Sequence, residues 1–239
     1  MHGLLAIESS QRAISVAIRC RDGSIVQRNP IGDPREKDLL LPAIVALCAD
    51  ANIARSELRA IAISTGPGGF TGLRVGIATA KGMCEALSIP AIDVPSAIVA
   101  AMGVRSQWWP RAREVVVALA AKGNECWLTT IDADDAGELS VRSAQWSRWN
   151  VENAIGFGSA MVLIADDHLP VEIRQRAIDT GMTILPPTFQ ASDCLAVAEA
   201  MLLRGEVTDS LGLCVRYPRE PEAVTIWRAR YPDGFTPKK

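Results

Sequence analysis

The residues best suited to chemistry form a glycine-rich segment between a short apolar run and a long helical pattern. The apolar run covers 59–64, residues 65–70 read Thr-Gly-Pro-Gly-Gly-Phe, and the helical pattern covers 71–87. Free backbone N–H groups at the start of such a helix can hold an anion, and Thr71 suits the N-cap position. The glycine spacing matches neither G-x-x-x-x-G-K-[ST] nor G-x-G-x-x-G. Neither of those two nucleotide-binding loops is therefore predicted here.

The helix predicted over 71–87 carries a stripe of small residues. Gly72, Gly76, Ala80 and Cys84 recur every four residues, which places them on one face. Glycine costs about 1 kcal/mol relative to alanine in a helix interior, so two on one face indicate close approach of another backbone. We expect another helix to pack there. The alternative, that this helix packs only within its own lobe, stays open on spacing alone.

A second apolar helix is predicted over 37–52. Its apolar residues recur at helical spacing on one side, and Leu39, Ala43 and Ala46 add a second apolar stripe. Such a helix requires burial on two sides.

The remaining pattern suggests two related α/β lobes. Three meandering strands over 3–8, 13–20 and 24–29 precede the helices and the strands at 59–64 and 91–94, and strands at 114–120 and 125–131 repeat the opening hairpin. Strands at 161–165 and 182–185 and a helix over 191–203 follow. Hairpins followed by alternating helices and strands, present twice, predict two lobes with a boundary near 103–112.

Composition excludes several classes of protein. The chain has 239 residues, a formal net charge of -2 and 22% charged residues, so no global positive field attracts nucleic acid. Its six cysteines form no C-x-x-C pair and its two histidines lack a partner at ligand spacing, which predicts no bound metal. The start lacks a signal-peptide pattern and no long uncharged apolar stretch occurs, so we expect a cytoplasmic protein without a membrane segment.

The glycine-rich segment also carries a family resemblance. Residues 65–81 resemble the signature of TsaB (YeaZ) proteins, with Gly69 where serine is usual. Residues 39–44 and 4–10 resemble that family's first helix and opening strand, and weaker similarity extends through 125–127 and 216–227. The residues of the family's glycine-rich loop are Thr65, Gly66, Pro67, Gly68, Gly69, Phe70, Thr71 and Arg74.

The resemblance implies an α/β, actin-like (ASKHA, ribonuclease H-like) fold with two lobes. The N-terminal lobe would be 1–104 and would carry the partner-binding helices, the smaller C-terminal lobe would be 105–216, and a tail would occupy 217–239. It implies a non-catalytic scaffold without a cofactor in the biosynthesis of tRNA N6-threonylcarbamoyladenosine, the modified adenosine next to the anticodon.

The same resemblance implies the partners. The chain would pair with and activate a TsaD-type transferase, join a TsaE-type ATPase in a ternary complex, meet tRNA indirectly, and form a homodimer when alone. The partner-binding residues would be Leu40, Leu41, Ile44, Leu47, Cys48, Gly72, Leu73, Gly76, Ile77, Ala80, Met83 and Cys84.

Some positions depart from family patterns. Glu8 stands where TsaB chains usually carry aspartate, and residues 120–122 read Ala-Ala-Lys where Asp-Ala-Arg is usual. Asp166 and Asp167 follow the strand at 161–165, where a glycine turn lies near adenosine in the wider superfamily, and these carboxylates would repel phosphate. The related TsaD proteins hold a metal through an H-x-x-x-H pair on the first helix, and residues 35–41 contain no histidine.

Other functions remain as alternatives. An ATP-dependent kinase of the actin and sugar-kinase superfamily would require ATP binding, and a glycoprotease-like peptidase would require a metal or nucleophile that the sequence does not display. Tryptophans and arginines cluster over 105–113 and 142–149, where they could stack on RNA or could seat loops on the second lobe. No G-x-S-x-G motif accompanies Ser9, Ser10 and His168, which argues against a hydrolase.

Overall fold

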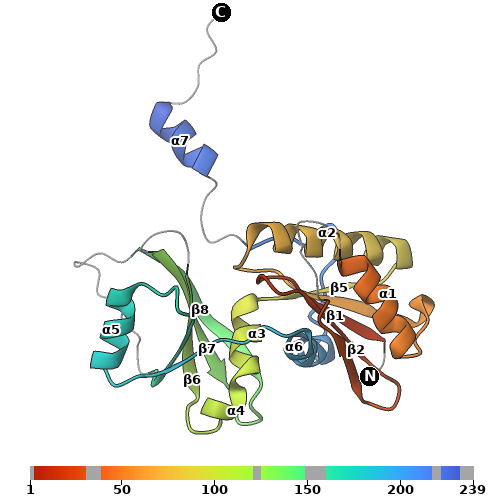
Figure 1. Ribbon diagram of the computed structural model, residues 1–239, viewed down its shortest axis with the longest axis horizontal. Coiled ribbons are helices and arrows are strands. Elements are labelled where there is room, and N and C mark those ends of the chain that lie inside the picture. The colour runs from red at the N-terminus through yellow and green to blue at the C-terminus, as the bar shows by residue number, and fades with distance from the viewer. Residues whose placement is uncertain (1–2, 31–38, 121–124, 149–159, 217–221, 232–239) are drawn as a thin grey trace, which may run out of the picture.

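Two five-stranded sheets form the frame of the molecule (Figure 1). The computed structural model describes residues 3–30, 39–120, 125–148, 160–216 and 222–231. The first sheet has the order β3-β2-β1-β4-β5, and the second has the order β10-β9-β6-β7-β8. Written from its other edge, the second sheet repeats the first: an antiparallel meander of three strands followed by two parallel strands. The predicted two-lobed α/β fold is confirmed.

The first lobe is built on nearly continuous apolar strands. Its strands are β1 Leu4–Glu8, β2 Ser15–Arg19, β3 Ile25–Arg28, β4 Ala60–Ser64 and β5 Ala91–Val94. Every residue of β1 and β4 is buried because helices cover both faces of the sheet. Since side chains alternate along a strand, Leu5 and Ile7 face one layer, and Leu4 and Ala6 face the other.

The helices α1 Leu40–Asp50 and α2 Phe70–Leu87 cover the outer face of the first sheet (Figure 1). Their apolar residues form one core with alternate residues of β1, β2 and β4. A short 3-10 helix, η1 Arg55–Glu57, joins α1 to β4. The outer layer of this lobe is therefore a two-helix layer on a buried sheet.

Two helices fill the space between the sheets. They are α3 Ser96–Gly103 and α6 Ala191–Leu203, and they share one apolar core with residues of both sheets (Figure 1). α6 packs across β1 and β2 although it follows the second lobe in sequence. The limits of the lobes at 104 and 216 stay a prediction.

The second lobe is smaller in its helical layer. Its strands are β6 Glu114–Ala120, β7 Glu125–Ala133, β8 Leu139–Arg148, β9 Val162–Ala165 and β10 Thr183–Leu185. The helix α5 Val171–Asp179 covers its outer face, and the short α4 Arg105–Trp108 precedes β6. The helix α7 Glu222–Arg230 lies apart from both lobes in Figure 1.

Most predicted elements are found, and several were missed. All five strands of the first lobe and the helix at 191–203 occur within two residues of their predicted bounds. The sequence did not predict α3, α5 or the long edge strand β8. The meander of the second lobe therefore has three strands, not only the predicted hairpin.

Among the described residues, no helix has the length and apolar character needed to cross a membrane.

Candidate functional site

The glycine-rich loop joins β4 to α2 and wraps around the turn that follows β1. Gly69 N–H donates a hydrogen bond of 2.7 Å to the Ser10 carbonyl oxygen. A Cβ atom on Gly68 would lie closer than 3.0 Å to Ser10 O, and one on Gly72 would lie closer than 3.0 Å to Ser9 O, a separation that real Cβ atoms do not show. These glycines therefore permit two backbone segments to touch.

The loop is anchored by the chain itself. Gly66 N–H donates to Ser96 Oγ at 2.9 Å, and Thr65 N–H donates to Val94 O at 2.9 Å. α2 begins at Phe70 with Gly69 as its N-cap. The prediction that Thr71 is the N-cap is wrong, since the helical conformation starts one residue before it. Three N–H groups that could have met an anion thus bind protein oxygens.

The segment before the C-terminal tail returns to this loop. Arg216 N–H donates to Thr65 O at 2.8 Å, and Arg216 Nη2 contacts Asp93 Oδ2 at 2.8 Å. Thr65 Oγ1 donates to the same carboxylate. Gly66 has a φ of +108°, and a Cβ there would lie 2.8 Å from Arg216 O. This carboxylate therefore joins β5, the loop and the C-terminal segment.

The stripe of small residues on α2 faces its own lobe. Gly76 is buried, and a Cβ on it would meet Ser9 Oγ and, at 3.1 Å, Ile63 Cδ1. Ala80 and Cys84 are buried in the core beneath α1 and α2. The expectation that a second helix packs on this stripe is wrong, because the turn after β1 and the sheet make the close approach. The open alternative, packing within the lobe, is what the structure has.

The predicted partner-binding residues divide into buried and reachable groups. Leu41 is exposed, and Cys48, Met83 and Gly72 are partly exposed. The remaining eight pack inside the lobe: Leu40, Ile44, Leu47, Leu73, Gly76, Ile77, Ala80 and Cys84. A partner could touch the two helices directly only through the first group and its exposed neighbours. Whether these helices bind a partner at all stays a prediction.

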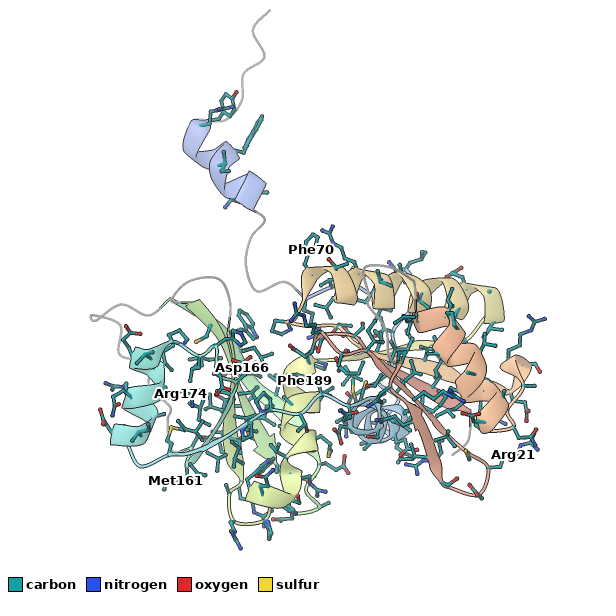
Figure 2. All side chains as sticks on the ribbon, viewed as in Figure 1. Arg21, Phe70, Met161, Asp166, Arg174 and Phe189 are labelled. Carbon is teal, nitrogen blue, oxygen red and sulfur yellow. The ribbon has the colours of Figure 1, made fainter. Side chains whose placement is uncertain are left out.

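An exposed apolar surface nevertheless covers these helices. We call it the outer helix face, and define it as Leu41, Val45, Phe70 and Val75, which are 45%, 70%, 55% and 40% exposed. Phe70 lies at the start of α2 (Figure 2), with the Arg74 guanidinium carbon 3.5 Å from its ring centroid. The partner-binding residues predicted from the sequence did not include Val45 or Val75. The spacing of Val45, four residues after Leu41, was a signal that could have found it.

A buried polar cluster lies beside the loop. Glu8 is fully buried, and Ser10 N–H donates to its Oε1 at 2.7 Å. Burial raises the pKa of Glu8, and this hydrogen bond opposes the rise. Burial also raises the pKa of Asp193, at the start of α6, to about 6. Glu8, which stands where the family usually carries aspartate, is thus buried in the protein interior and closed to solvent.

The second-lobe carboxylates occupy the end of β9. Asp166 Oδ1 accepts a hydrogen bond from His168 N–H at 2.9 Å, and Arg174 Nη2 donates to Asp166 O at 2.6 Å (Figure 2). Arg174 also lies 3.7 Å from Asp167 Oδ1. One arginine of α5 therefore partly neutralises a turn that was predicted from its two carboxylates to repel phosphate.

The tryptophan and arginine cluster at 105–113 has a structural role. Trp108 is 1% exposed and its Nε1 donates to Ala101 O at 3.1 Å. The Arg113 and Arg105 guanidinium carbons lie 4.3 and 5.6 Å from the Trp109 ring centroid. The described residues do not include the side chains of 145–149, the hairpin at 121–124 or residues 35–38. Trp108 thus seats the connection between lobes.

The repeated sheet order, with helices between and outside the sheets, defines an actin-like, two-lobed α/β protein. A solved structure described as YeaZ from Pseudomonas aeruginosa superposes with a TM-score of 0.72 at 22% identity, covering 91% of this chain and 100% of that one. This likeness confirms the fold.

Sequence comparisons show which proteins the chain resembles. Residues 35–145 match the family model described as TsaD, tRNA N6-adenosine threonylcarbamoyltransferase. The tRNA threonylcarbamoyladenosine biosynthesis protein TsaB of Haemophilus influenzae is 31% identical over 128 residues, 54% of this chain and 53% of that protein. Its namesake in Escherichia coli is 27% identical over 136 residues, 56% of this chain and 57% of that protein. The chain therefore spans about half the length of these curated relatives. Together these matches show that the chain is similar to TsaB (YeaZ) proteins.

Proposed function

We propose that this protein is a non-catalytic scaffold subunit in the biosynthesis of tRNA N6-threonylcarbamoyladenosine. It pairs with a TsaD-type transferase through the outer helix face and activates that transferase. A TsaE-type ATPase joins the pair, and tRNA meets this chain through the complex. The names of the relatives TsaB support the pathway.

The observation that carries the proposal is the exposure of apolar side chains on α1 and α2. Val45 is 70% exposed in the middle of α1, whereas Ile44 and Leu47 of the same helix are buried. An apolar surface in contact with water contributes binding energy when a partner covers it, at about 25 cal/mol per Å² removed from water. Both helices pack on the same face of the first sheet, because their buried residues share one core (Figure 1).

The interior geometry supports a rigid scaffold. The glycines of the loop hold α2 against the turn after β1, and Asp93 ties the loop to Arg216. α2 therefore cannot shift relative to the sheet without breaking backbone contacts. A partner that docks on α1 and α2 meets a preformed surface, which lowers the entropy cost of association.

The test is a pair of charge substitutions on exposed valines. Val45→Glu places a carboxylate in the proposed interface, whereas Val171→Glu changes a valine of α5 that is 75% exposed on the other lobe. Burying an unpaired charge costs at least 1–3 kcal/mol, which corresponds to roughly a ten- to hundredfold loss of affinity. Sedimentation of each variant with the TsaD-type subunit of the same organism measures the effect.

The expected result is weakened pairing for Val45→Glu and unchanged pairing for Val171→Glu. Reconstituted threonylcarbamoylation of tRNA is expected to fall with the same variant. Equal affinity of both variants for the transferase would contradict the proposed surface.

A further inference from the structure

The helix α7 carries an aromatic side. Val224, Trp227 and Tyr231 recur at i, i+3 and i+7, which places them on one side of the helix. The Trp227 and Tyr231 ring centroids lie 4.5 Å apart, and Trp227 is 47% exposed. Arg228 and Arg230 lie in the last turn and are exposed. We call these five residues the α7 face, which combines an apolar strip with two positive charges.

The helix α7 is too short to be stable without a surface to pack on. It has nine residues and lies apart from both lobes in Figure 1. Isolated helices shorter than about 12–15 residues are marginal in water, because most helical stability in proteins comes from packing of an apolar face. Ile226, which is 56% exposed, adds to the apolar surface of α7 in contact with water. Since neither lobe of the single chain covers α7, a second molecule is the natural source of that surface.

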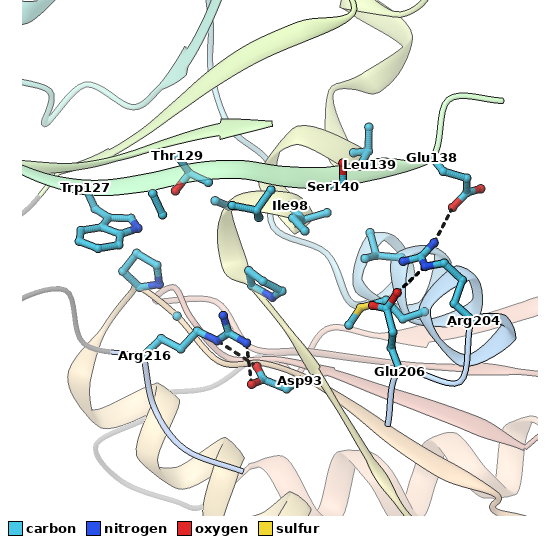
Figure 3. Close-up of a pocket in the computed structure, with 18 of the residues that line it drawn as sticks. Asp93, Ile98, Trp127, Thr129, Glu138, Leu139, Ser140, Arg204, Glu206 and Arg216 are labelled. Carbon is cyan, nitrogen blue, oxygen red and sulfur yellow. Dashed lines mark hydrogen bonds and ion pairs between the residues drawn. The ribbon is translucent and has the colours of Figure 1, made fainter. Parts of the chain in front are cut away.

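The chain leaves the first lobe for α7 from a fixed point. Arg216 N–H donates to Thr65 O at 2.8 Å, and the Arg216 guanidinium contacts Asp93 at 2.8 Å (Figure 3). A Cβ on Gly66 would lie 2.8 Å from Arg216 O and 3.1 Å from Leu73 Cδ1. Arg216 therefore lies beside the first turn of α2.

A partner on the outer helix face is within reach of α7. Phe70, which belongs to that face, begins the turn beside Arg216. Five residues separate Arg216 from Glu222, so α7 begins at most about 22 Å from Arg216. A stable complex buries about 800 Å² on each partner, from roughly 20 residues a side. The four apolar side chains of the outer helix face supply only part of such an interface, and α7 extends it.

We propose that α7 is a second docking element for the transferase, and that it binds an apolar groove bordered by carboxylates on that partner. Trp227 and Tyr231 fill the groove, and Arg228 and Arg230 face its carboxylates. The inference rests on the proposed function, because it takes the transferase on the outer helix face as the molecule that α7 reaches. Once that face is bound, the contact of α7 is intramolecular, so even a weak contact adds to the affinity.

A tryptophan substitution tests the apolar contact. Trp227→Ala truncates the largest side chain of the α7 face, whereas the control Ile178→Ala truncates a side chain of α5 that is 54% exposed on the other lobe. In sedimentation with the TsaD-type subunit of the same organism, Trp227→Ala is expected to weaken pairing about tenfold or more, and Ile178→Ala to leave it unchanged. The melting temperature of Trp227→Ala should equal that of the parent protein, because α7 lies apart from both lobes.

Charge reversal tests the carboxylates of the groove. A variant with both Arg228→Glu and Arg230→Glu is expected to bind the transferase at least about tenfold more weakly at low salt. The difference from the parent protein should shrink as salt screens the charges. Equal affinities of variant and parent at low salt would overturn the charged border of the groove.

Hydrogen exchange of peptides covering 222–231 shows what α7 binds. These peptides are expected to exchange rapidly in the chain alone and to gain protection when the transferase is added. Protection in the chain alone would overturn the proposal, since it would place α7 on its own lobes if independent of concentration and on a second copy if it rose with concentration.

The two docking elements fail separately. Weakened pairing of Val45→Glu together with undiminished pairing of Trp227→Ala would overturn the role of α7 and leave the proposed function standing. The reverse pattern would support α7 as a docking element and contradict the outer helix face. Undiminished pairing of both variants would overturn both.

Discussion

Replacing Gly72 with alanine tests how tightly α2 is held against the turn after β1. The added methyl would lie closer than 3.0 Å to Ser9 O, which is a backbone atom and cannot rotate away. Overpacking of this kind costs typically 1–3 kcal/mol, and a backbone obstacle puts the cost near ~3 kcal/mol. Alanine recovers up to about 1 kcal/mol of helix propensity. The expected net loss is about 2 kcal/mol of unfolding free energy.

Gly82 provides a matched control on the same helix. A Cβ there meets nothing within 4 Å, and the residue is exposed. Gly82→Ala is therefore expected to stabilise the protein by about 0.5–1 kcal/mol. The two alanine variants should differ by about 3 kcal/mol, which for a chain of this size is roughly 6–12 °C in melting temperature.

Thermal and urea unfolding followed by circular dichroism measure both changes. The prediction requires opposite signs, with Gly72→Ala below the parent protein and Gly82→Ala above it. If Gly72→Ala proved as stable as Gly82→Ala, the close contact between α2 and the turn at Ser9 would not exist in solution.

Three further predictions concern buried groups. Ser9→Ala is expected to rescue much of the unfolding free energy lost in Gly76→Ala, because the methyl group added at position 76 would meet Ser9 Oγ. Additive changes of unfolding free energy in a double-mutant cycle would refute this. Because burial raises the pKa of Asp193 to about 6, the folded protein keeps a proton that the unfolded chain releases, so this residue's contribution to unfolding free energy falls as pH rises from about 4 to above 6. Urea titrations at several pH values should show a smaller fall in Asp193→Asn, and an unchanged slope would count against the assignment. Burial raises the pKa of Cys84 to about 11, whereas Cys214 is exposed. A thiol reagent at pH 8 should therefore modify Cys214 first. Mass spectra that show modification of Cys84 before Cys214 would contradict the packing.

The first lobe was predictable because its patterns were strong. Its strands β1 and β4 are short apolar runs bounded by polar or turn residues, and α1 and α2 show apolar residues at helical spacing. Local pattern and tertiary environment agree in these segments, so a reading of periodicity finds them.

The missed elements lack such a pattern for identifiable reasons. α3 is buried nearly all round between the two sheets, so its apolar run Ser96–Gly103 shows no helical periodicity. β8 is an edge strand whose residues 140–144 are exposed, and a bulge interrupts its register opposite Thr130 and Ile131. Edge strands tolerate polar residues, so β8 resembles a loop in sequence.

In the candidate site, the spacing of the glycines on α2 predicted a close contact but not the segment that makes it. Gly72 correctly indicated close approach of another backbone, but spacing does not say whose backbone that is. The structure assigns it to Ser9 of the same lobe, whereas Gly76 faces the side chains of Ser9 and Ile63. The exposed Val75 has the same residue type as buried core valines, so only the fold distinguishes it from them.

Hydrogen exchange of this protein, measured with and without the TsaD-type subunit of its own organism, shows whether α1 and α2 bind that subunit. Added protection is expected to concentrate in peptides covering α1 and α2, including Val45 and Val75, while α5 with Val171 exchanges as before. Protection confined to the second lobe, or no protection anywhere with both proteins at concentrations that sustain modification of tRNA, would contradict it.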